Sequence, residues 1–195
     1  AGDASGRGLP HYYTFATNHD PVSGTFSEFE EIDPLTGRGT ILWSLGADVT
    51  GADPRGYACP LGLAFDRDGT MYTVVDWVFG PTVSSQFAKV DVRTGAVTYI
   101  GQPYAIHMSG PVIDHSGNIY TMGFSNGANH LPPDIFIGDQ NLYRINKRTG
   151  VATRVGDTGL RDIMDLAFDP DGHLYATTMN KLYVINTGNG ASRKV

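Results

Sequence analysis

One phrase is written three times along this chain. It consists of a short apolar run, an Asp/Gly turn and a second apolar run that ends in Tyr: "GLAFDRDGTMY" (62–72), "GPVIDHSGNIY" (110–120) and "DLAFDPDGHLY" (165–175). A second phrase, built on an Asp or Asn and a Gly at fixed spacing, alternates with it: "EIDPLTGRGT" (31–40), "KVDVRTGAVT" (89–98), "RINKRTGVAT" (144–153) and the degenerate "VINTGNGASR" (184–193). Such short units cannot bury their apolar residues alone, so they must pack against one another.

Superposing the phrases places four tyrosines on one position: Tyr13, Tyr72, Tyr120 and Tyr175. Each of the four units then predicts a strand a, an Asp/Gly turn, a strand b, a variable stretch, a strand c, a Thr-Gly turn and a strand d. Four antiparallel strands at a spacing of 40 to 59 residues are typical of β-propeller blades. We therefore predict an all-β fold, with one propeller domain over 1–195 and units near 8–46, 59–101, 107–156 and 162–195.

The first unit departs from this pattern, because "DASGRGLP" before "HYYTFAT" has no apolar run that could form strand a. We expect a first blade without its innermost strand. The chain would then be a four-bladed ring with one incomplete blade, or part of a larger propeller.

Composition excludes several partners and locations. With 41% hydrophobic residues among 195, the chain can bury a core, while a net charge of −6 with only 14 Lys and Arg argues against nucleic acid. The single cysteine excludes an internal disulfide. No apolar run approaches the roughly 20 residues that cross a bilayer, so we expect a soluble protein and no membrane partner. The opening "AGDASG" is compatible with signal-peptide removal and favours a secreted or periplasmic location.

"GLAFDRDGTMY" followed by "FAKVDVRTGAVTYIG" resembles the blades of the NHL-repeat, virginiamycin B lyase-like and gluconolactonase-like propellers. The resemblance covers almost the whole chain and implies the fold. These repeats occur in scaffolds, sensors, lyases and lactone hydrolases, so it does not imply one function. The metal ligands of the lyases and lactonases have no clear counterparts here.

Strand direction predicts which face carries a site. The short Asp/Gly and Thr-Gly turns lie on one side, and the b–c and d–a connections lie on the other. We expect the latter to be long and irregular at 17–27, 46–58, 76–86 and 123–140. Because insertions in repeat proteins gather on the binding face, that side is the predicted site.

Three residues share the position three places ahead of the strand a phrase: Cys59, His107 and Asp162. We expect them to converge at the mouth of the central channel as catalytic residues. They could act as a thiol nucleophile, its base and an orienting carboxylate. Alternatively, His107 and Asp162 could hold one divalent metal ion as the cofactor, with water completing its shell. The competing interpretation is structural, with Cys59 as a small buried hydrophobe and a channel mouth that is polar but unreactive.

Further candidates for ligand binding are His19, Asp76, Trp77 and His130 in the connections, and Asp165 near the channel. Aromatic rings provide stacking area for sugars or apolar rings, although Trp77 could equally cover the core. The turns "DRDG" and "DPDG" resemble the start of a calcium loop but lack its later ligands, so they are predicted to be tight turns.

Three functions remain open. The first is a module that binds a small molecule, glycan or protein on the connection-bearing face. The second is a metal-assisted lyase or a lactone or ester hydrolase with its site at the channel mouth. The third is an assembly role, in which a partner chain supplies the missing strand of the first unit.

Overall fold

The structure, a computed structural model, describes residues 12–20, 24–45, 57–79, 82–104, 106–124 and 139–195. For 15–20, 24–27, 45, 57–59, 77–79 and 82–83 it describes the backbone path alone. Among the described residues, no helix is long and apolar enough to span a bilayer.

The described chain forms four antiparallel sheets, here called blades 1 to 4. Blade 1 contains β1 (Tyr12–Asp20), β2 (Gly24–Ile32) and β3 (Gly39–Leu45). Blade 2 contains β4 (Tyr57–Pro60), β5 (Ala64–Phe65), β6 (Met71–Phe79), β7 (Thr82–Val90) and β8 (Val97–Tyr99). Blade 3 contains β9 (Val112–Ile113), β10 (Ile119–Phe124), β11 (Gln140–Ile145) and β12 (Ala152–Leu160). Blade 4 contains β13 (Asp165–Phe168), β14 (Leu174–Thr177), β15 (Leu182–Ile185) and β16 (Ser192–Lys194).

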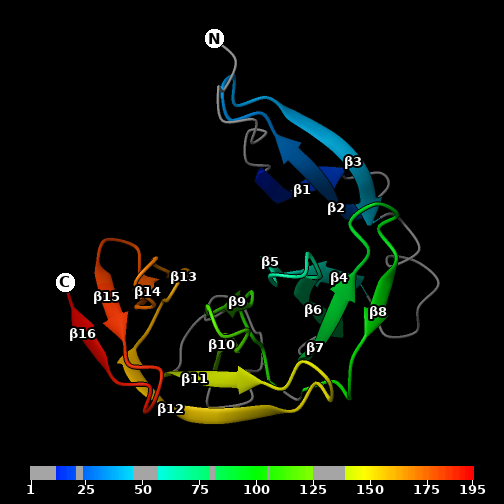
Figure 1. The fold of residues 1–195 in the computed structure, drawn as a ribbon. Coiled ribbons are helices and arrows are strands. Elements are labelled where there is room, and N and C mark those ends of the chain that lie inside the picture. Colours follow the sequence, from blue (N-terminus) through cyan, green and yellow to red (C-terminus); the bar gives the residue numbers. More distant parts are fainter. Residues whose placement is uncertain (1–11, 21–23, 46–56, 80–81, 105, 125–138) are drawn as a thin grey trace.

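The blades follow one another around a common centre, with β5, β9 and β13 on the inner side (Figure 1). The fold is thus a four-bladed β-propeller, as the repeat predicts. Blade 1 has three strands within the described residues, in the order β1-β2-β3. Residues 1–11, where an innermost strand would precede β1, lie outside the described residues, so the expected absence of that strand stays a prediction.

The repeat phase is confirmed by the strand register. The four tyrosines occupy one position on the second strand of the pattern, where they pair with Glu31, Lys89, Arg144 and Val184 respectively. The innermost segments also match, because the amides of Leu61, Ser109 and Met164 donate to the carbonyls of Val74, Met122 and Thr177, each at 2.8 Å. Cys59, His107 and Asp162 lie two residues before these amides and are therefore equivalent.

The core lies between blades. Tyr72, Val74 and Phe87 of blade 2 pack against Met108, Ile119 and Ile145 of blade 3. The equivalent residues of blade 3, Tyr120, Met122 and Leu142, pack against Ile163, Leu166 and Leu174 of blade 4. The repeated hairpin is apolar on both faces because each blade covers the next one, which buries area that one blade alone would expose.

Two of the connections differ from the expectation of irregular insertions. Pairing between β6 and β7 continues from Asp76–Ser85 to Phe79–Thr82, and pairing between β1 and β2 runs to Asp20–Gly24. Within 76–86 and 17–27 the described residues are therefore long hairpins, so the expectation of irregular insertions was wrong there. The β-branched and aromatic residues in these stretches, such as Trp77, Val78 and Phe79, favour continued strands. The other two connections, 46–58 and 123–140, lie largely outside the described residues.

Candidate functional site

A buried carboxylate contacts a histidine from the neighbouring blade on the connection face, the side of the propeller that carries the b–c and d–a connections. Asp76 lies on β6, between β4 and β7, and only 4% of it is exposed. Its Oδ2 atom bonds to Nδ1 of His107, and its Oδ1 atom accepts a hydrogen bond from the Ser85 hydroxyl. Both oxygens of this carboxylate thus have partners, as burial of a charged group requires.

Ser85 links this set to the junction between blades 2 and 3. Its hydroxyl oxygen accepts a hydrogen bond from the Met108 amide at 2.8 Å, one residue after His107. Its backbone exchanges hydrogen bonds with Tyr104, at 3.1 Å from the Ser85 amide and 2.6 Å from the Tyr104 amide. The Tyr104 hydroxyl donates to the Gly150 carbonyl, and burial raises the pKa of Tyr104 to about 12. Tyr104 therefore remains a neutral structural donor.

The imidazole is also held from blade 3. Its ring stacks on Phe124, with centroids 5.3 Å apart, and the Phe124 amide donates to the His107 carbonyl at 3.2 Å. A carboxylate on Nδ1 fixes the neutral ring in the tautomer with hydrogen on Nδ1, so Nε2 carries the lone pair. In that form Nε2 can accept a hydrogen bond or a proton, or ligate a metal.

The predicted site residues are distributed unevenly around this pair. The structure brings together His107 and Asp76, which the sequence assigned to different groups. Cys59 pairs with Asp76 through the backbone register of β4 and β6, while its side chain lies outside the described residues. The side chains of His19 and Trp77, and all of His130, also lie outside them.

The two remaining acids are exposed. Asp162 has a φ of 60°, in the left-handed region. Asp165 accepts a hydrogen bond from the next amide, that of Leu166, at 2.8 Å. The catalytic and metal-binding roles of Cys59, His107 and Asp162 stay predictions.

Within the described part of the chain, one group of three side chains has metal-ligand spacing: Asp169, Asp171 and His173. It lies in the "DPDG" turn of blade 4, at the opposite end of the blades from His107. Asp169 Oδ1 accepts from the amides of Asp171 and His173 at 2.9 and 2.8 Å. These bonds form the tight turn that the sequence predicts.

Sequence reasoning missed the Asp76–His107 contact because it read 76–86 as a connection. Had β6 been extended through Asp76, the register would have placed this acid beside the innermost strand. It also missed a cleft between blades 3 and 4, on the face of the short turns, which has a volume of about 930 Å³.

Comparison with known proteins supports the fold alone. No family model and no curated protein matches the sequence. The structure is similar to TolB from Acinetobacter baumannii, with 14% identity and a TM-score of 0.52, over 94% of this chain and 39% of that one. It is also similar to the PQQ-bound aldose sugar dehydrogenase of Streptomyces coelicolor (19% identity, TM-score 0.47, 83% of this chain and 56% of that one). A protein assigned as a gluconolactonase gives 12% identity and a TM-score of 0.46, over 97% and 65%. This chain thus spans less than two thirds of each.

Proposed function

We propose that this propeller is a ligand-binding module whose site lies on the connection face and is centred on His107. The observation that carries the proposal is the buried Asp76–His107 pair at the junction of blades 2 and 3. Its cost in desolvation is offset by hydrogen bonds that also orient the ring. A fixed imidazole acceptor stacked on the aromatic ring of Phe124 suits a small molecule or glycan that offers hydroxyl donors and an apolar face.

A panel of neutral mono- and disaccharides, screened by thermal shift, tests this function. A saccharide that binds the native state must raise the unfolding midpoint. We expect His107→Gln to abolish the shift and His173→Gln, an exposed histidine on the opposite face, to leave it unchanged. Equal loss in both variants, or no shift of the unaltered protein with any saccharide, would contradict the proposal.

The same pair favours a second function, a metal-assisted lyase or hydrolase. Metal-bound histidines commonly donate their other ring nitrogen to a carboxylate, as His107 does to Asp76. A bound divalent ion would polarise a substrate carbonyl while a neighbouring group moves a proton. Asp162, Asp165 and Cys59 are the further ligands that the sequence suggests.

Zn²⁺ titration and elemental analysis of the purified protein separate the two functions. If a metal is held, loss of the orienting carboxylate in Asp76→Asn should weaken Zn²⁺ binding by about 10- to 100-fold. No bound metal, and equal Zn²⁺ affinity before and after His107→Ala, would remove the enzyme candidate and leave the binding module untouched. A secreted or periplasmic location, and a partner chain that completes blade 1, stay predictions.

A further inference from the structure

The cleft between blades 3 and 4 lies among the short turns, on the opposite face from His107. Fourteen residues line it, and none of them is Asp or Glu, although the chain as a whole carries a net charge of −6. Three of the fourteen are cationic: Arg144, Lys147 and Arg154. Positive charge is thus concentrated in one concave region of an acidic protein, where it raises the local concentration of anions.

The cleft exists at this junction because the residue that bridges the equivalent groove between blades 2 and 3 is replaced here by a shorter one. Between blades 2 and 3, the Lys147 ammonium group reaches across to Asp66, with Nζ and Oδ2 2.7 Å apart. The residue of blade 4 equivalent to Lys147 is Thr187, whose side chain is too short to make that bridge. The groove that Lys147 spans at one junction therefore stays open at the next.

The carboxylate equivalent to Asp66 is engaged by its own turn. Asp114 accepts hydrogen bonds from the amides of Ser116 and Asn118, both at 2.8 Å, and from the Asn118 side chain at 2.7 Å. Burial acts to raise its pKa, but these bonds and the charge of Arg144 outweigh burial and lower it. Asp114 is thus an ionised neighbour of the cleft whose carboxylate is held in place by its own turn.

The two arginines bond to neutral amides. Arg144 donates from Nη2 to Oδ1 of Asn118, and Arg154 donates from Nε to Oδ1 of Asn141 at 2.8 Å. Among the described residues neither guanidinium forms an ion pair. Each of these bonds uses one of the five N–H donors of a guanidinium, so donors suited to an oxyanion remain.

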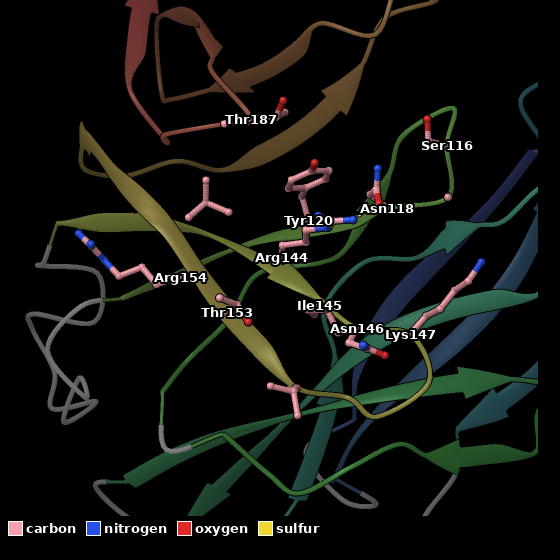
Figure 2. A pocket seen from close by; sticks show the side chains of 14 residues that line it. Ser116, Asn118, Tyr120, Arg144, Ile145, Asn146, Lys147, Thr153, Arg154 and Thr187 are labelled. Atoms are coloured by element: carbon pink, nitrogen blue, oxygen red, sulfur yellow. Dashed lines mark hydrogen bonds between the residues drawn. The ribbon is translucent and has the colours of Figure 1, made fainter.

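Uncharged groups complete the cleft. Tyr120 is 6% exposed, and Thr187 lines the cleft from blade 4. Figure 2 shows Arg144 below the Tyr120 ring and extending towards Asn118, which lies beside the ring, with Thr187 on the blade 4 side. An anion on Arg144 would have hydroxyl groups and an aromatic edge within the same concavity.

We propose that this cleft binds a small hydroxylated organic anion, whose carboxylate or phosphate group is held by Arg144 in the field of Arg154. The site is separate from the one centred on His107. It therefore does not depend on the function proposed above.

Isothermal titration with glucuronate, glucose 6-phosphate and uncharged glucose tests the proposal. We expect the charged sugars to bind at least about tenfold more tightly than glucose, since charge-assisted hydrogen bonds provide much of the affinity. Their relative order distinguishes a carboxylate site from a phosphate site. Equal affinity for glucose and both charged sugars, or no binding of any of them, would overturn the proposal.

Arg144→Gln and Lys89→Gln form a matched pair of variants. Both positions are exposed and lie opposite the repeat tyrosine, in blades 3 and 2 respectively. We expect Arg144→Gln to weaken binding of the charged sugars about tenfold or more, as loss of a charge-assisted bond predicts. Lys89→Gln should leave it unchanged. Circular dichroism and the unfolding midpoint verify that both variants fold, and equal losses in the two would argue for non-specific attraction.

Thr187→Lys offers an independent test from the other side of the cleft. It places on blade 4 the cation that blade 3 uses to span its own junction. We expect this variant to bridge towards Asp114 and to reduce binding of the charged sugars despite its added positive charge. Stronger binding in this variant would mean that bulk charge, not the shape of the open cleft, determines affinity. His107→Gln should have no effect on this binding.

Discussion

In the c–d turns, Asp and Asn occupy the same position and form the same hydrogen bond. Asp33 and Asp91 occupy this position in blades 1 and 2, and Asn146 and Asn186 occupy it in blades 3 and 4. In every case Oδ1 accepts the amide two residues later, at distances of 2.8, 2.9, 3.0 and 2.8 Å in chain order. The amide oxygen and the carboxylate oxygen are thus equivalent as acceptors, but only the carboxylate titrates.

This difference predicts that the c–d turns of blades 1 and 2 respond to acid and that those of blades 3 and 4 do not. Hydrogen bonds, first from the Thr94 amide, lower the pKa of Asp91 below its ordinary value of 3.8. A lowered pKa in the folded state stabilises the fold above the unfolded value, and this contribution is lost as pH falls through the folded value. We expect Asp91→Asn to keep its unfolding midpoint at pH 7 and to lose less stability than the unaltered protein between about pH 5 and 2. Urea unfolding at a series of pH values measures this. An unchanged pH profile would contradict it.

At the scale of elements, the strands and turns could be predicted because their signals are local. A Gly that supplies positive φ and an Asp that bonds to its own turn lie close together in the sequence, so the repeat phase follows from the sequence. Hairpin length and the Asp76–His107 contact could not be read this way. Hairpin length depends on how far the backbone pairing of β6 and β7 continues. The Asp76–His107 contact joins residues 31 positions apart across two blades.

Close backbone approach between blades determines where side chains are excluded. Gly150, in the c–d turn of blade 3, lies against the end of β8 in blade 2, and a Cβ on it would come 2.1 Å from the Ile100 carbonyl oxygen. At the next junction, a Cβ on Gly156 would come 1.8 Å from the Asn189 carbonyl oxygen. Because the obstacle is backbone, it cannot rotate away.

Gly156→Ala should therefore push blades 3 and 4 apart and destabilise the fold by about 3 kcal/mol, at the upper end for overpacking. Gly69→Ala is the control, since Gly69 has a φ of 82° but no atom lies within 4 Å of the place that a Cβ would occupy. Backbone strain alone should cost that variant about 1 kcal/mol. Chemical denaturation of both gives the comparison. Equal costs would show that contact at the junction is unimportant.

At the scale of the whole molecule, each blade is covered by the next one along the chain. Phe29, Phe87 and Leu142 share one repeat position in blades 1 to 3, and each is 0% exposed. The equivalent residue of blade 4, Leu182, is 40% exposed. One position in the sequence pattern thus has two environments, because the covering blade and not the blade itself determines burial.

Leu142→Ala and Leu182→Ala measure this coverage with one chemical change. Truncation at Leu142 leaves a cavity between blades 3 and 4 and should cost about 3 kcal/mol, within the range for buried leucines. The half-exposed Leu182 should cost about 1 kcal/mol or less, because little burial is lost. Urea unfolding of the two variants gives both values. A large cost at Leu182 would mean that its face is covered in solution.

Ser85 links the candidate site around His107 to the packing of blade 3 on blade 2. One hydroxyl both fastens blade 3 to blade 2, through the Met108 amide, and orients the Asp76 carboxylate on which the imidazole rests. By thermodynamic reciprocity, any molecule that binds the His107 imidazole in this orientation must also make blades 2 and 3 harder to separate. Ligand binding at the site would then be detectable as slower hydrogen exchange of the backbone amides along the junction of blades 2 and 3.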